Sequence, residues 1–499
     1  MFLHDLPVKI AAVIIMFELE WNSSVMTRAQ VGFFFLHVVM QIPAGMKAEK
    51  YGGKIVMQLS MFFCSLISLL TPLSIIVGSK VFFILFVSLQ GLGEGCFIPT
   101  FYVFTSRWVP SQQRSRLFSA GFGGMHFGSL VGIPIIKRIT DIWWFSGFLL
   151  SAILGFMWVI MSIYFVQLWR PRKRLSLRSR KNLHLVFRKI RISETGASLK
   201  VPWSKILMSL PFWCTMISHF GAVWANSIFL RDLSYFESLY EIFLGPEFMI
   251  QPFVVSLIAI VIFVIFIEIL KHYKIRLQVR RKIMNSICLW GSSLMLLILA
   301  VNTTFDLQFE VTIFMIGAAC TSASYTGVFL NHAELSPIFA GTLMGISNVV
   351  GNSASIVKPL LRHRMLEHER FIRSKENSHE EWTWYFIVNA VILFYINLPF
   401  LLYGRSKEQL WYHPDEVAQR LNKEYDIDLT TNEREKKPET SLHENYVDSV
   451  ILQRNSDRRK HLSRLFPTHT IPNSIMDASA EEDSRQCQIN EESLGKMGI

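Results

Sequence analysis

Long apolar stretches alternate with short polar ones along most of the chain. A helix that crosses the hydrocarbon core of a bilayer needs roughly 20 mainly apolar residues. The pattern predicts eleven such helices, at residues 30–46, 55–77, 80–103, 117–136, 142–168, 210–230, 248–270, 283–301, 308–330, 338–361 and 384–403. A further apolar stretch, 6–17, is short and contains Lys9, so we expect either a short first span or an interfacial segment there.

The polar stretches between the predicted spans alternate in charge. If the stretch 6–17 spans, the strongly basic loops at 47–54, 107–116, 170–205 and 271–282 all lie on one side. The positive-inside rule makes that side cytoplasmic, and both termini then lie in the cytoplasm. The two N-glycosylation sequons, at Asn22 and Asn302, fall in predicted outer loops, so we expect glycans there.

The order of spans predicts an all-α membrane protein built from two six-helix bundles. We expect an N-terminal bundle over 1–169, a basic cytoplasmic loop over 170–205 and a C-terminal bundle over 206–403. Two repeats of six helices typically form a binding site at their interface, near the middle of the membrane. The remainder, 404–499, is polar and charged and is predicted to be a mostly disordered cytoplasmic tail.

Composition supports a membrane protein and excludes several other classes. Hydrophobic residues make up 51% and charged residues 18%, against about 25% charged in soluble proteins. The net charge of +12 would be compatible with nucleic-acid binding, but 404–499 holds 14 basic and 18 acidic residues, which leaves 36 and 20 in the apolar part. The positive excess therefore lies in the membrane loops, and the expected partners are a lipid bilayer and a small solute rather than nucleic acid.

The chain lacks the motifs of an enzyme or a metal protein. No CxxC pair, no Cys/His metal spacing and no phosphate-binding GxxxxGK[ST] occurs. We therefore expect no enzyme activity, no metal site and no cofactor other than a coupling ion. The oligomeric state and the choice between plasma membrane and endomembrane stay open.

A gate is predicted in the first two basic turns. The turn from Gly45 to Lys54 contains Glu49, which can pair with a base or face a helix N-terminus, and the flanking Lys50 and Lys54. Arg114 and Arg116 in the next basic turn are predicted to neutralise Glu49 and form a cytoplasmic latch. A plain basic loop that only sets the topology is the alternative.

Polar residues inside the predicted spans are the other candidates. Glu94 is an intramembrane acid, and such residues are functional candidates because their insertion is costly; glycines 91, 93 and 95 around it allow close helix approach. His126 lies among glycines 124, 128 and 132, which predict a tightly packed helix face, and is either a hydrogen-bonded structural group or a proton carrier. A polar hinge with Asn331, His332 and Glu334 precedes Gly341, Gly345 and Asn348, and the amide of Asn348 can reach a cavity.

Taken together, these segments resemble one family. Phe33-Phe-Phe, Gln41-Ile-Pro, the turn 45–54, the run 91–99, Arg107-Trp-Val-Pro, Arg281-Lys-Ile-Met-Asn and the run 331–348 are similar to the anion:cation symporter family of the major facilitator superfamily. That family includes sodium/phosphate cotransporters, sialin and vesicular glutamate transporters, and the chain resembles its inorganic phosphate cotransporter members of insects. The resemblance covers about residues 18–411. It implies twelve helices, alternating access, and anion transport coupled to Na⁺, H⁺ or the membrane potential.

The chain departs from the family where an anion would bind. Residues 18–22 already match the segment before the family's second helix, which leaves no room for a full first helix with its arginine. Val87 stands where the family usually has an arginine, Ala222 where the glutamate-transporting branch has one, and Tyr102 where many relatives have histidine. The resemblance thus implies a substrate and coupling set of Glu94, Tyr102, His126 and Asn348. The predicted function is secondary active transport of inorganic phosphate or small organic anions. The alternative is a degenerate member that acts as a receptor or scaffold.

Overall fold

The computed structural model describes most of the apolar part of the chain. It describes residues 23–110, 112–168, 200–231, 246–302, 306–366, 375–409 and 411. Contacts divide the chain into Met1–Leu421 and Asn422–Ile499, and every described residue lies in the first unit. The predicted first span at 6–17, the sequon at Asn22, most of the loop 170–205 and nearly all of the tail 404–499 lie outside the described residues.

The elements in the described part of the chain are helices, as the all-α prediction requires, and no strand occurs there. They are α2 Ser23–Tyr51, α3 Gly53–Ile76, α4 Lys80–Trp108, α5 Arg114–Thr140, α6 Ser146–Leu168, α8 Trp203–Leu207, α9 Leu210–Arg231, α11 Pro246–His272, α12 Leu277–Ser286, η1 Ile287–Gly291, α13 Ser292–Val301, α14 Leu307–Thr321, η2 Ser322–Tyr325, α15 Val328–Leu335, α16 Ala340–Leu366 and α17 Lys375–Tyr403.

Every predicted span from 30–46 onward coincides with a helix or with two helices joined end to end. By length and apolar composition, nine candidate membrane spans are found within the described residues. The predicted spans at 210–230 and 338–361 coincide with α9 and α16, which lie outside that set. Both carry buried polar side chains, among them His219 on α9 and Asn348 on α16. Many helices run past the predicted limits, since the helices continue through the polar turns at the membrane surface.

Two predicted spans are interrupted. The helix expected over 283–301 contains the π-turn η1, and the helix expected over 308–330 breaks at the 3₁₀ turn η2 before α15 begins. At η2 the hydroxyls of Thr321 and Ser324 donate to the backbone oxygens of Ala318 and Thr321. Such local bonds compete with the regular helical pattern and free backbone groups for other partners.

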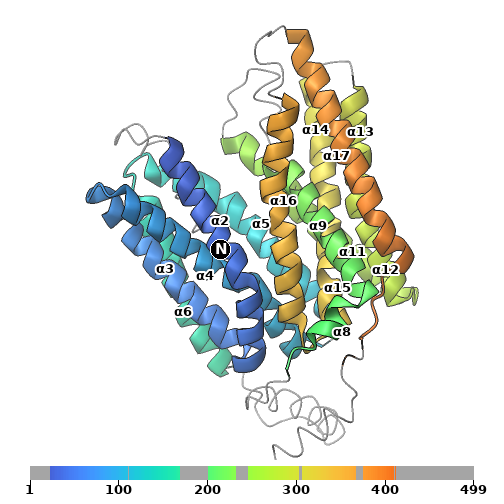
Figure 1. Ribbon diagram of the computed structural model, residues 1–499, viewed down its shortest axis with the longest axis horizontal. Helices are drawn as coiled ribbons and strands as arrows, with labels where there is room; N and C mark the ends of the chain where they lie inside the picture. Colours follow the sequence, from blue (N-terminus) through green and yellow to red (C-terminus); the bar gives the residue numbers. More distant parts are fainter. Residues whose placement is uncertain are drawn as a thin grey trace, which may run out of the picture. The chain divides into compact units, whose positions relative to one another are not determined.

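The helices pack in two groups, α2 to α6 and α9 to α17 (Figure 1). Close packing of α2 on α4 depends on glycine, since a Cβ on Gly91 would lie 2.8 Å from the backbone carbon of Phe33. The predicted close approach at Gly91 and Gly95 is confirmed. The predicted packed face on the fifth span is wrong for Gly124 and Gly128, because nothing lies within 4 Å of a Cβ built on either of them.

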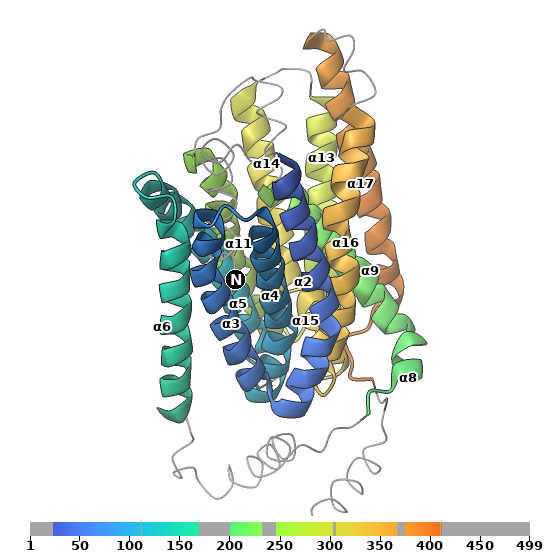
Figure 2. The same cartoon turned by 60° about the vertical axis from the view of Figure 1, so that its left-hand side comes forward.

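Contacts between the two groups involve five helices in particular. Helices α2 and α4 pack against α16, and α5 packs against α11. Figure 2 shows α16 beside α2. These pairs bring residues of both groups together and set the position of the candidate site.

Candidate functional site

The ends of the helices that carry the basic loops meet closely. We call this the basic end; it comprises the C-terminal turns of α2, α4 and α15 and the N-terminal turns of α5, α12 and α16. The backbones of α2 and α16 touch there, because a Cβ on Gly45 would lie 2.5 Å from the carbonyl carbon of Gly341 and 2.9 Å from the nitrogen of Thr342. A Cβ on Gly345 would lie 2.7 Å from the oxygen of Gln41. Only glycine permits such contact between helices.

Glu49 reaches across from α2 to the first turn of α16. Its carboxylate accepts hydrogen bonds from the backbone nitrogen of Thr342, at 2.6 Å, and from the Thr342 hydroxyl, at 2.7 Å. The first amides of a helix have no partner within the helix, and the positive end of its dipole favours an anion. Arg107 of α4 holds the same turn of α2 by donating to the backbone oxygen of Glu49 at 2.6 Å. Lys50 lies over the ring of Tyr51, 5.1 Å from its centroid, and Lys54 lies in the first turn of α3.

Arg114 and Arg116 do not bind Glu49 as expected. Arg114 donates to the backbone oxygens of Ser106 and Val109 in its own group and of Ala333 in the other group. Arg116 pairs with Glu268 of α11 at 2.7 Å. The carboxylate of Glu49 already has two donors on α16, so the arginines bind other acceptors at the same end.

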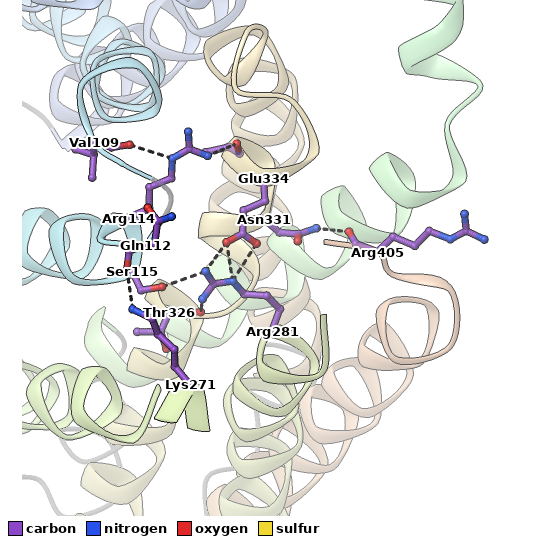
Figure 3. Close-up of polar contacts among 11 residues, drawn as sticks. Val109, Gln112, Arg114, Ser115, Lys271, Arg281, Thr326, Asn331, Glu334 and Arg405 are labelled. Carbon is purple, nitrogen blue, oxygen red and sulfur yellow. Dashed lines mark hydrogen bonds and ion pairs between the residues drawn. The ribbon is translucent and has the colours of Figure 1, made fainter. Parts of the chain in front are cut away.

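A buried ion pair lies beside Arg114 (Figure 3). Arg281 of α12 pairs with Glu334 of α15, and the side chains are 2% and 8% exposed. The guanidinium also donates to the backbone oxygen of Thr326, at 2.5 Å, and to the hydroxyl of Ser115 on α5, at 3.1 Å. The Thr326 oxygen is available because the helix breaks at η2. Arg281 thereby joins α12, α15 and the turn after η2 to α5 of the other group.

The pair between Arg116 and Glu268 is a counterpart of the contact made by Glu49. In each case an acid near the C-terminus of one helix meets the third residue of a helix in the other group: Thr342 in α16, or Arg116 in α5. The two contacts differ in burial, since the Arg116 side chain is 59% exposed.

We expect replacement of Arg116 by alanine to change the free energy of unfolding by less than about 1 kcal/mol, because exposed ion pairs are screened by water and salt. Thermal unfolding of the purified protein in detergent measures this. Lys271 serves as the control, since it also contacts Glu268, at 3.5 Å, from an exposed position. A loss of several kcal/mol on Arg116→Ala would contradict this assignment.

A line of polar side chains crosses between the groups farther from the basic end. The Asn348 amide nitrogen donates to the Gln41 side-chain oxygen at 3.1 Å, and the Gln41 amide nitrogen lies 2.9 Å from Nε2 of His37. On its other side, the Asn348 side-chain oxygen lies 3.1 Å from Nε2 of His219. This line therefore connects α2 with α16 and α9, and all four side chains are buried.

An aromatic cluster joins α4 and α5 to the other group. The Tyr102 hydroxyl donates to the backbone oxygen of Phe329 at 2.7 Å, and Nε2 of His126 lies 2.8 Å from the Tyr325 hydroxyl. The ring of Phe122 stacks on both Tyr325 and Phe329. The histidine and the tyrosine predicted for the substrate site thus both bridge the interface.

The remaining predicted residues have these places. Glu94 is buried in α4 between Gly93, which packs on α3, and Gly95, which packs on α2. The predicted polar hinge is instead the helix α15: the Asn331 amide donates to Thr215 and to the backbone oxygen of Arg405, and His332 is fully buried. The amide nitrogen of Asn302, to which a glycan would be attached, donates to Glu310 at 2.9 Å.

Both positions where the family resemblance expects an arginine are apolar and buried. Val87 packs in a cluster with Phe33 and Phe83, and Ala222 lies in the core of the other group. Neither provides a cation for an anionic solute.

Sequence reasoning missed several residues of this interface. Arg281 falls in the basic loop 271–282, where the sequence indicates only a topology signal, although it lies just before an apolar span. His37 and His219 are intramembrane histidines like His126, and the same argument about costly polar groups in spans would have singled them out. Glu268 lies at the polar limit of its span, where an acid is ordinary.

Comparisons with known proteins agree with this arrangement. The family model described as Major Facilitator Superfamily matches residues 6–359. A Drosophila ananassae protein named "Putative inorganic phosphate cotransporter" is 26% identical over 81% of this chain and 83% of its own length. Human sialin is 23% identical over 84% of this chain and 83% of its own. Bovine vesicular glutamate transporter 2 is 24% identical over 81% of this chain and 68% of its own length.

Solved structures show the same fold. The proton:xylose symporter bound to 6-bromo-6-deoxy-D-glucose has a TM-score of 0.59 at 12% identity, over 81% of this chain and 94% of that one. The E. coli fucose:proton symporter has a TM-score of 0.53 at 12% identity, over 79% of this chain and 96% of that one. The predicted fold is therefore confirmed, and the chain belongs to the major facilitator superfamily.

Proposed function

We propose that this protein is a secondary active transporter that moves inorganic phosphate or a small organic anion by alternating access, coupled to Na⁺ or H⁺. The observation that carries the proposal is the set of separable contacts between the two helix groups at the basic end. Alternating access requires one side of the site to close while the other opens. The relatives named as a phosphate cotransporter, sialin and a glutamate transporter support an anionic solute.

In this proposal the basic end faces the cytoplasm, as its positive charge favours. Glu49, Arg114, Arg116, Asn331, His332 and Glu334 close it, with Lys50 and Lys54 at its rim. The two bundles correspond to 1–169 and 206–403, joined by the loop 170–205 and followed by the tail 404–499. The contacts that Glu49, Arg114 and Arg116 make across the two groups are hydrogen bonds and an exposed ion pair whose partners water can replace, so the end can reopen at modest cost.

The coupling and substrate residues of this proposal are Glu94, Tyr102, His126 and Asn348. Glu94 is the coupling or gating acid of this proposal. Tyr102, His126 and Asn348 each hydrogen-bond across the interface, so their partners change when the groups separate.

We expect Glu94→Gln to reduce cation-coupled uptake of radiolabelled phosphate to background, because the amide cannot exchange a charge with the coupling ion. Uptake into proteoliposomes measures this, with Asp141→Asn, at an exposed position, as the control. Unchanged coupled uptake in Glu94→Gln would remove this residue from the mechanism.

A second candidate function rests on Val87 and Ala222. A chain whose anion-binding positions are apolar can keep the fold and act as a receptor or scaffold. Absence of uptake and of exchange for phosphate, sialic acid and glutamate in the unmodified protein would favour this candidate.

A further inference from the structure

Two buried histidines face each other where α9 and α15 meet α4. The rings of His219 and His332 are perpendicular, with centroids 5.2 Å apart, and both side chains are fully buried. The ring of Tyr102 lies 6.1 Å from that of His332. One nitrogen of each histidine, Nδ1 of His219 and Nε2 of His332, has no hydrogen-bond partner within the described residues.

The hydrogen bonds of the pair determine which nitrogen carries the proton. The Asn348 oxygen can only accept, so Nε2 of His219 must donate to it, and Nδ1 of a neutral His219 is then a bare lone pair. The Phe329 backbone oxygen can only accept, so Nδ1 of His332 donates to it at 3.2 Å, and Nε2 of a neutral His332 is the second bare lone pair. The orientation of Asn348 agrees with this assignment, because its nitrogen donates to the side-chain oxygen of Gln41.

Two buried acceptors without a donor form a site for one proton. A proton on either ring makes that ring a donor, and the like charge disfavours a second proton on its neighbour. A sodium ion is a poor occupant, since hard cations prefer oxygen ligands and imidazole nitrogen suits softer ones. The lone pairs therefore select a proton.

The proton also replaces a cation that the chain lacks. Ala222, which aligns with an arginine of the family's glutamate-transporting branch, follows His219 by one helical turn on the same face of α9. A positive charge on the buried pair is unfavourable alone, and an anion in the site is unfavourable without a cation. Each therefore increases the affinity for the other, which is the thermodynamic requirement for cotransport.

No carboxylate contacts the pair among the described residues. The titratable or charged side chains on the surrounding elements include His37 and Glu49 on α2, Glu94, Tyr102 and Arg107 on α4, Arg114 and His126 on α5, Tyr325 on η2, Arg281 and Lys282 on α12 and Glu334 on α15 itself. Glu334 is bound by Arg281 and Glu49 by Thr342. The counter-charge for a proton on the pair must come from the solute.

We propose that one proton, held by His219 and His332, is the coupling ion of this protein and supplies the positive charge that binds the substrate anion. This inference rests on the proposed anion transport and names its coupling ion. The proton enters as H⁺ on one bare ring nitrogen and leaves from the same nitrogen when the anion departs. No covalent bond of the anion changes.

Proteoliposomes containing the full chain test the proposal, with inorganic phosphate as the first probe and sialic acid and glutamate as the others. An inward proton gradient should drive uptake, and an inward sodium gradient should not. His219→Gln keeps a donor for Asn348 but has no proton site, so it and His332→Gln should lose the response to the proton gradient. His272→Gln, at an exposed position of α11, is the matched control.

Calorimetric binding in buffers of different ionisation enthalpy provides a readout independent of transport. The unmodified protein should take up about one proton per anion bound. His219→Gln should bind the anion on the order of 10- to 100-fold more weakly, with no proton uptake. If both variants fail to fold, the number of protons that the unmodified protein takes up per anion bound decides whether the proposal holds.

Three results would overturn this inference without affecting the proposed function. The first two are uptake driven by sodium in the unmodified protein and anion binding without proton uptake. A full response to the proton gradient in a folded His219→Gln would do the same. If the unmodified protein neither binds nor transports any of the three anions, the proposed function fails, and this inference with it.

Discussion

Replacing Arg281 with methionine should lower the free energy of unfolding by about 3–5 kcal/mol, because removal of one partner leaves a buried charge without compensation. Arg281 is 1% exposed, and its guanidinium is shared by the carboxylate of Glu334, the backbone oxygen of Thr326 and the hydroxyl of Ser115. Methionine fills much of the volume but donates no hydrogen bond. Denaturation of the purified protein in detergent micelles measures the loss.

Two further variants separate the ion pair from general disruption. The double variant Arg281→Met with Glu334→Leu should recover much of the stability, since replacement of a whole buried pair by apolar groups is often close to neutral. Arg276→Met, at an exposed position before α12, should stay within about 0.5 kcal/mol of the unmodified protein. A single variant as stable as Arg276→Met would show that Arg281 does not hold the basic end together.

Replacing Gly45 with valine should prevent the basic end from closing. A Cβ at this position would lie 2.5 Å from the carbonyl carbon of Gly341. Because the obstacle is backbone, α2 and α16 must move apart, and Glu49 then loses both hydrogen bonds to Thr342. We expect a cost of about 1–3 kcal/mol to the closed arrangement and a longer distance between the two helices at this end.

Spin labels on cysteines introduced at Tyr51 and Ile338, which are both exposed, report that distance by pulsed electron resonance. Gly124→Val is the matched control, because it makes the same substitution in a helix where nothing lies within 4 Å of the added Cβ. An unchanged distance in Gly45→Val would contradict the role of the glycine contact in closure.

The position of the helices was predictable because the bilayer demands long apolar stretches, and each predicted span from 30–46 onward coincides with one helix or with helices joined end to end. Glu49 was predictable too: an acid in a glycine-rich turn between spans has few uses other than to meet a base or a helix N-terminus. Which of the two it meets depends on the packing of α2 against α16, separated by almost 300 positions in sequence, and single-sequence reasoning does not give that pairing.

The packed face of the fifth span, the role of Arg281 and the histidine pair depend on tertiary packing, which the local sequence pattern does not show. The glycines of the fifth span have the spacing of a packed face, yet Gly124 and Gly128 have no neighbour, because it is His126 and Phe122 that face the other group. In the sequence Arg281 is one of several basic residues of a loop. Its buried position depends on the break at η2, which leaves the backbone oxygen of Thr326 free to accept a hydrogen bond from its guanidinium. The bare lone pairs of His219 and His332 follow only from knowing the partners of the opposite nitrogens.

The central claim is that the protein moves an anion against its gradient at the expense of a cation gradient. The most direct test is accumulation of radiolabelled phosphate, sialic acid or glutamate in proteoliposomes with an imposed proton or sodium gradient. We expect one of these anions to accumulate above its external concentration and to be released when an ionophore collapses the gradient. Equilibration without accumulation for all three anions, under both gradients, would contradict it.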